Sequence, residues 1–95
     1  MSAAAARAPR PEPFETACFS VHARAEPGVL PRVVELFAKR GLVPTSLHGA
    51  AQRPGEGELT IDIQMRGMAG ELADYVAMCL RQIVGVEVVL TSRKH

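Results

Sequence analysis

The side chains that could act as nucleophile and base lie close together in the sequence, near the N-terminus. Cys18 and His22 fall on the same side of an expected strand. A nucleophile and its base must lie about 3 Å apart, whereas four residues of a strand span roughly 13 Å, at about 3.3 Å each. These two side chains therefore cannot form a dyad, and a small hydrolase that depends on His22 is disfavoured. Cys79 falls on the apolar stripe of an expected helix and is interpreted as a small core residue.

Several polar side chains are expected on the outer face of a sheet. His22, His48 and Asp62 could meet there, but no close-spaced pair of metal ligands supports a metal site, so we interpret them as a solvated surface. Sheets that bind RNA expose aromatic side chains, whereas the same face would carry Ser20, His22, Asp62 and Gln64. We therefore expect no metal, no cofactor, no nucleic acid and no catalytic activity.

A helix start within "EPGVLPRVVELFAKRGL", residues 26–42, is the better candidate for a binding site. Unpaired N–H groups and a partial positive charge at a helix start stabilise a carboxylate or phosphate. No Ser, Thr, Asp or Asn directly precedes Val29 to cap the helix, and Gly28 has no side chain to keep a ligand away. The alternative is that Gly28 only permits a positive φ in a tight connection, with water or Glu26 capping the helix. The spacing leaves both interpretations open.

Length and composition indicate one small domain. The chain has 95 residues, of which 47% are apolar and 22% charged, as in an ordinary globular protein. A domain of this size buries only about 60% of its unfolded surface, so we expect a dimer or larger assembly. Residues 1–15, rich in alanine and proline, are expected to form a disordered tail before a domain at residues 16–93.

The net charge and the cysteine content indicate which partners and which cellular compartment to expect. The net charge of +1 gives no reason to expect nucleic acid or an anionic membrane as the partner. No apolar run approaches the roughly 20 residues that cross a bilayer. Two cysteines without C-x-x-C spacing favour a reducing cytoplasm.

Hydrophobic periodicity predicts four strands and two helices. Alternation predicts strands at residues 16–24, 58–66 and 86–93, and a weaker strand at residues 42–52, which Pro44 assigns to a sheet edge. Helices are predicted at residues 29–40 and 71–84. The last strand is expected to bury Val86, Val88 and Leu90 and to expose Glu87 and Thr91. The helix stripes are expected to comprise Leu30, Val33, Val34 and Phe37, and Leu72, Val76, Cys79, Leu80 and Ile83.

The element order predicts the fold class. Strand, helix, strand, strand, helix, strand is the βαββαβ plan of the α+β, ferredoxin-like fold. In this plan a four-stranded antiparallel sheet carries both helices on one face, and the second strand lies at an edge.

Within this plan, "EPGVLPRVVELFAKRGLVPTSL" resembles the ACT domain, the regulatory amino-acid-binding module of many biosynthetic enzymes. The "SL" of the second strand and the ending "CLRQIVGVEVV" are most similar to the small subunit of acetolactate synthase. The resemblance covers about Ala17 to Leu90. It implies a non-catalytic subunit that activates the acetolactate synthase catalytic subunit in branched-chain amino-acid biosynthesis. The alternative is a free-standing amino-acid sensor that acts on another enzyme.

The resemblance also implies a ligand site shared by two copies that pair along their second strands. The loop of one copy would contact the carboxylate of a branched-chain amino acid, and the start of the partner's second strand would close the site. Ala25 and Val43 stand where feedback-sensitive subunits carry Asn, so backbone amides would hold the carboxylate and Glu26 the ammonium. The implied residues are Glu26, Gly28, Val29, Leu30, Val43, Pro44 and Thr45.

Overall fold

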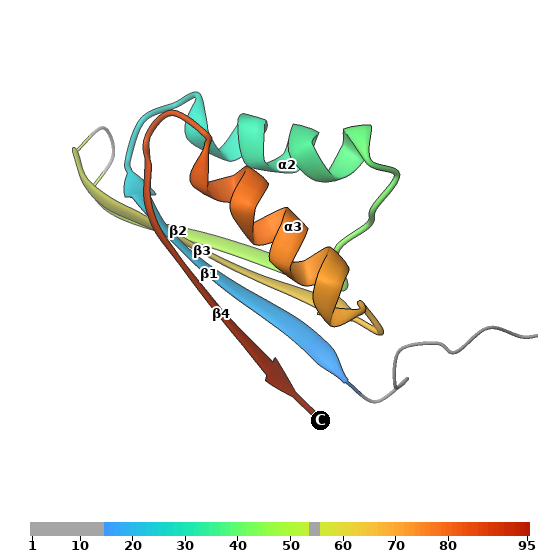
Figure 1. Ribbon diagram of the computed structural model, residues 1–95. Coiled ribbons are helices and arrows are strands. Elements are labelled where there is room, and N and C mark those ends of the chain that lie inside the picture. The colour runs from blue at the N-terminus through green and yellow to red at the C-terminus, as the bar shows by residue number, and fades with distance from the viewer. Residues whose placement is uncertain (1–14, 54–55) are drawn as a thin grey trace, which may run out of the picture.

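A computed structural model describes residues 15–53 and 56–95, which form one sheet covered on one face by two helices (Figure 1). The elements are β1 (Thr16–Arg24), α2 (Val29–Lys39), β2 (Ser46–Arg53), β3 (Glu56–Arg66), α3 (Gly70–Arg81) and β4 (Val86–Lys94). Their sheet order is β2-β3-β1-β4, with all neighbours antiparallel. The predicted ferredoxin-like fold is confirmed, and β2 lies at an edge. The predicted tail, apart from Glu15, lies outside the described residues, as do residues 54–55 of the turn after β2.

The two central strands supply the sheet side of the core. Along β1 and β3 every second residue faces the helices, and Phe19 pairs with Ile63 while Val21 pairs with Ile61. The alternation predicted for these two strands is confirmed. The buried residues on this face are Ala17, Phe19, Val21, Ala23, Leu59, Ile61, Ile63 and Met65.

Helix α2 is rotated by one residue from the predicted stripe. It buries Val29, Val33, Leu36 and Phe37. Leu30 and Val34, predicted to be buried, are 36% and 48% exposed. The sequence holds apolar pairs at 29–30, 33–34 and 36–37, so periodicity alone fits two adjacent stripes. Leu30 and Val34 instead lie on the side of α2 that faces β2: a Cβ placed on Gly49 would be 3.9 Å from a Leu30 methyl group.

Helix α3 also differs from its prediction. It ends at Arg81 rather than Val84, and it buries Ala73, Val76, Ala77 and Leu80. Leu72, expected in the core, is 39% exposed, and Cys79 and Ile83 are only partly buried. Two alanines on the buried stripe let this helix approach the sheet closely, and a search for large apolar residues overlooks them.

Strand β4 contradicts the predicted alternation. A bulge where β1 passes from His22 to Ala23 changes the register, so that Val86 pairs with Ala23 whereas Val88 pairs with His22. Val89 is therefore the buried residue, and Val88 and Leu90 lie on the outer face, 45% and 58% exposed. Thr91 pairs with Phe19 and faces the helices rather than the outer side. A bulge of this kind leaves no mark in the apolar pattern.

The segment before β2 is not a strand. The prediction started β2 at residue 42, but the strand begins at Ser46, so Pro44 precedes the ladder. Thr45 anchors this approach: its N–H donates to the Gln64 carbonyl at 2.8 Å, and its hydroxyl accepts from the Arg66 N–H at 2.9 Å. In the described part of the chain, no helix is long and apolar enough to cross a membrane.

Candidate functional site

The N-terminus of α2 has no cap from a described side chain, and an arginine side chain lies beside it. Gly28 is the N-cap with φ −80° and ψ −10°, a conformation open to any residue, so the interpretation that glycine serves a positive φ here is wrong. No described side chain caps the helix. A Cβ at position 28 would lie 2.8 Å from Nη1 of Arg32. The missing side chain therefore makes room for a guanidinium group.

The loop is capped in part by its own backbone. The Val29 N–H donates to the Glu26 carbonyl at 3.1 Å, so this amide is not free for a ligand. Among the described residues, the amides of Gly28 and Leu30 have no hydrogen-bond acceptor. The Glu26 carboxylate accepts a hydrogen bond from Nε of Arg24 at 3.0 Å. Two amides and the helix dipole thus present positive charge at this end of α2, and the Arg32 guanidinium lies beside Gly28, an arrangement that suits a carboxylate.

The other predicted site residues lie at the opposite end of α2. Val43 and Pro44 contribute to an apolar groove of about 320 Å³ between the C-terminal half of α2 and the start of β2. Val43 is 86% exposed. Since α2 runs from the Gly28 loop to this groove (Figure 1), one chain does not bring the two sets together. The residues that line the groove are Val34, Phe37, Ala38, Leu42, Val43, Pro44 and Leu47.

The outer sheet face holds a hydrogen-bonded chain of three side chains that the sequence reasoning missed. The Ser20 hydroxyl lies 3.1 Å from Nε2 of His22, and Nδ1 of His22 lies 3.2 Å from Oε2 of Glu58. In the sequence only Cys18 was weighed as the partner of His22, although Ser20 lies two residues from His22 on the same face. That spacing was the available signal.

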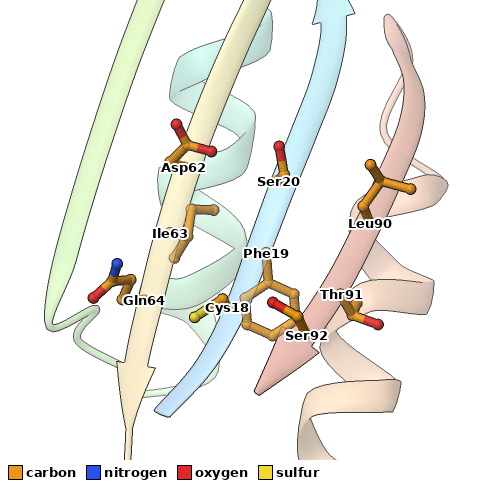
Figure 2. Close-up of a pocket in the computed structure, with 9 residues that line it drawn as sticks. All are labelled: Cys18, Phe19, Ser20, Asp62, Ile63, Gln64, Leu90, Thr91 and Ser92. Carbon is orange, nitrogen blue, oxygen red and sulfur yellow. The ribbon is translucent and has the colours of Figure 1, made fainter. Parts of the chain in front are cut away.

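A pocket of about 380 Å³ adjoins this chain on the outer face. Figure 2 shows the Ser20 hydroxyl at one of its walls, with Asp62 on one side and Leu90 on the other. His48 pairs with Asp62 across β2 and β3. Within residues 15–53 and 56–95, no three His, Cys, Asp or Glu side chains are placed to hold a metal ion.

Cys79 is held at the edge of the core by a cation. Arg40 donates to its sulfur at 3.5 Å and to the Leu36 carbonyl at 3.0 Å, and its guanidinium lies 5.6 Å from the centre of the Tyr75 ring. Hydrogen bonding to Tyr75 raises the pKa of Arg40 further above its usual value. This cluster joins the end of α2 to α3.

Comparison with known proteins assigns the family. Residues 14–95 match the ACT-like domain family. The chain belongs to that family. Among solved structures, the ACT-like domain is similar to the ACT domain from GTP pyrophosphokinase of Chlorobium tepidum, with 15% identity, a TM-score of 0.70, and coverage of 83% of this chain and 97% of that one.

A second similar structure is the C-terminal domain of the MgtC protein from Mycobacterium tuberculosis. It has 18% identity and a TM-score of 0.59, and the alignment covers 87% of this chain and 90% of that one. At these identities the likeness shows the fold. No curated protein sequence matches the ACT-like domain significantly. ACT domains are regulatory domains that bind small molecules, and the resemblance to that family is confirmed.

Proposed function

We propose that this chain is a regulatory module that pairs through β2 and binds the carboxylate of a small amino acid between two copies. Its partner enzyme is the acetolactate synthase catalytic subunit, as the sequence resemblance implies. The observation that carries the proposal is an apolar strip, comprising Leu30, Val34 and Val43, beside an edge strand. These side chains are 36%, 48% and 86% exposed in one chain.

An antiparallel pairing of two β2 strands supports the shared site. The start of β2 lies near Val43, whereas its end lies near the Gly28 loop (Figure 1). Antiparallel pairing about the middle of β2 places the start of one strand opposite the end of the other. Val43, Pro44 and Thr45 of one copy thereby approach the Gly28 loop of its partner. The apolar strip is covered in the same step, and the unpaired strand edge is satisfied.

The ligand's carboxylate suits the start of α2. The Gly28 and Leu30 amides and the Arg32 guanidinium supply donors of the right sign. Glu26 supplies the only negative charge of the predicted loop and pairs with the ligand's ammonium in exchange for Arg24. The exposed apolar side chains of Leu30 and Val43 suit a branched aliphatic side chain.

Calorimetric titration with valine, leucine and isoleucine tests the ligand site. Gly28→Ala places a methyl group where the Arg32 guanidinium lies and displaces this flexible group, so we expect binding to weaken about tenfold by loss of one charge-assisted hydrogen bond of about 1.5 kcal/mol. The matched control is Gly70→Ala, since Gly70 also begins a helix but its Cβ would meet nothing within 4 Å. Equal affinities in the two variants, or no binding by the unchanged chain, would contradict the site.

Sedimentation equilibrium tests the pairing. Val43→Asp puts a charge beside the β2 edge and should weaken the dimer, whereas Val88→Asp, at an exposed valine near the opposite edge, should not. A monomer at all concentrations would refute the proposal. The partner is tested separately, by adding the chain to the acetolactate synthase catalytic subunit and measuring turnover. Amino-acid binding without complex formation or a gain in turnover would favour the free-standing sensor.

A further inference from the structure

The chain Ser20–His22–Glu58 has the connectivity of a nucleophile, its base and the group that orients the base. Ser20 and His22 are two residues apart on β1, and Glu58 reaches His22 from the neighbouring β3. The His22 and Glu58 side chains are 29% and 43% exposed, so reagents can reach them. Such constellations are recognised by geometry and role rather than by sequence position.

The carboxylate fixes the direction of the hydrogen bonds. An ionised glutamate can only accept a hydrogen bond, so the contact with Glu58 requires the His22 tautomer whose N–H is at Nδ1 and donates to the carboxylate. In the neutral ring, Nε2 is then the acceptor, and it faces the Ser20 hydroxyl at 3.1 Å. Ser20 donates to the ring, which is the arrangement that base-assisted attack by serine requires.

The Ser20 hydroxyl opens on the pocket of about 380 Å³ that Figure 2 shows. Leu90 forms an apolar wall, suited to a short acyl chain. Asp62 pairs with Ser20 across the strands and disfavours an anionic guest. The pocket therefore suits a small, uncharged acyl compound with its carbonyl carbon toward Ser20.

We propose that Ser20 is a covalent acyl-acceptor site, which takes the acyl group of a small activated ester or thioester. The Ser20 oxygen forms a bond to the carbonyl carbon while its proton passes to Nε2 of His22. The bond from that carbon to the leaving oxygen or sulfur then breaks, and the leaving group takes the proton from His22. Ser20 ends as an ester, His22 ends neutral, and no redox partner is needed.

The backbone limits the reaction to one turnover. The amides of β1 are committed to its ladders with β3 and β4, so they offer no oxyanion hole at Ser20. An activated leaving group compensates for this lack in the first step. The resulting serine ester is an ordinary alkyl ester, so its hydrolysis lacks both an activated leaving group and an oxyanion hole. The acyl group therefore stays on the protein.

The test is acetylation by p-nitrophenyl acetate, followed by nitrophenolate release, intact mass and peptide mapping. We expect a burst of about one equivalent and a stable acetyl ester on Ser20, since base assistance contributes roughly 10²- to 10⁴-fold. Ser20→Ala should abolish the label, and His22→Gln should slow labelling at least tenfold. Ser46→Ala, which removes an exposed hydroxyl of β2 outside the pocket, should label at the normal rate.

Glu58 is a positioning residue, and its test is rescue by a conservative variant. Glu58→Ala removes the carboxylate that orients Nδ1 of His22, so labelling of Ser20 should slow, and Glu58→Gln, which keeps an acceptor oxygen at that place, should restore part of the rate. Thermal melts establish that each variant is folded. Nitrophenolate release that persists in folded Ser20→Ala, labelling confined to lysines, or an unchanged rate in His22→Gln would overturn the proposal.

Discussion

Gly85 is the residue whose replacement most directly tests the packing around the candidate ligand loop. It lies buried between α3 and β4 with φ +101°, and its carbonyl accepts the Arg24 N–H at 2.9 Å. A Cβ at this position would be 2.7 Å from a methyl group of Val29 and 3.4 Å from a carboxylate oxygen of Glu26. Gly85→Ala therefore strains the backbone and pushes against Val29 at the start of α2.

The expected cost follows from three contributions. A positive φ costs an L-residue about 1–2 kcal/mol. Val29 is fully buried, and forcing an extra methyl group into a packed core costs about 1–3 kcal/mol. Alanine has less freedom than glycine in the unfolded chain, which returns about 0.4–1 kcal/mol. These ranges combine to about 1–5 kcal/mol, so we expect Gly85→Ala to lower the free energy of unfolding by about 3 kcal/mol.

Two other glycines separate these contributions in urea denaturation. Gly41 has φ +69° but would meet nothing within 4 Å, so Gly41→Ala should cost only about 0.5–1 kcal/mol. Gly70 has neither constraint, and Gly70→Ala should be neutral or slightly stabilising. If the costs of Gly85→Ala and Gly41→Ala agree within about 0.5 kcal/mol, the close contact with Val29 is refuted. Both glycines have a positive φ, so this contact is the reason to expect a larger cost at Gly85.

Three further predictions concern the core, the approach to β2 and pH. Phe37→Ala should cost about 3–5 kcal/mol in urea denaturation, because Phe37 is 1% exposed; a cost below about 1 kcal/mol would contradict its place in the core. Thr45→Val should cost about 0.5–1.5 kcal/mol by loss of the acceptor for the Arg66 N–H, and an unchanged midpoint would refute that role. A group whose pKa is raised on folding contributes stability that is lost only as the pH rises through the folded-state pKa. The melting-temperature difference between Arg40→Gln and the unchanged chain should therefore be the same at about pH 5 and pH 7, and a difference that changes between them would contradict this reasoning.

The fold was predictable from the sequence because its central strands alternate without interruption. In β1 and β3 the period of two is unbroken from Ala17 to Ala23 and from Leu59 to Met65, and both strands are held on two sides in the sheet. The edge strands were harder to predict from the sequence. The bulge opposite His22 shifts β4 by one residue and so exchanges the faces of Val88 and Val89, and no property of the apolar pattern fixes where a bulge falls.

The candidate sites were predictable only where they depend on residues that are close together in the sequence. The glycine at the start of α2 was found, but the Arg32 guanidinium that occupies its open space depends on a side-chain conformation. The Ser20–His22 spacing was visible in the sequence, whereas Glu58 joins it only through the register of β1 with β3. Residues 36 positions apart meet because of strand pairing, which a one-dimensional pattern does not record.

The errors in the apolar stripes have a common physical cause. Leu30 and Val34 repeat with a helical period, yet they lie on the side of α2 toward β2 and stay 36% and 48% exposed. A chain that buries one stripe of α2 and carries a second beside an unpaired strand has more ordered apolar surface than one copy can cover. Scattered exposed apolar residues need no explanation, but a strip that follows the helix period beside an unpaired edge indicates a contact surface. The second stripe is therefore the feature of α2 that most favours the proposed pairing of two copies through β2.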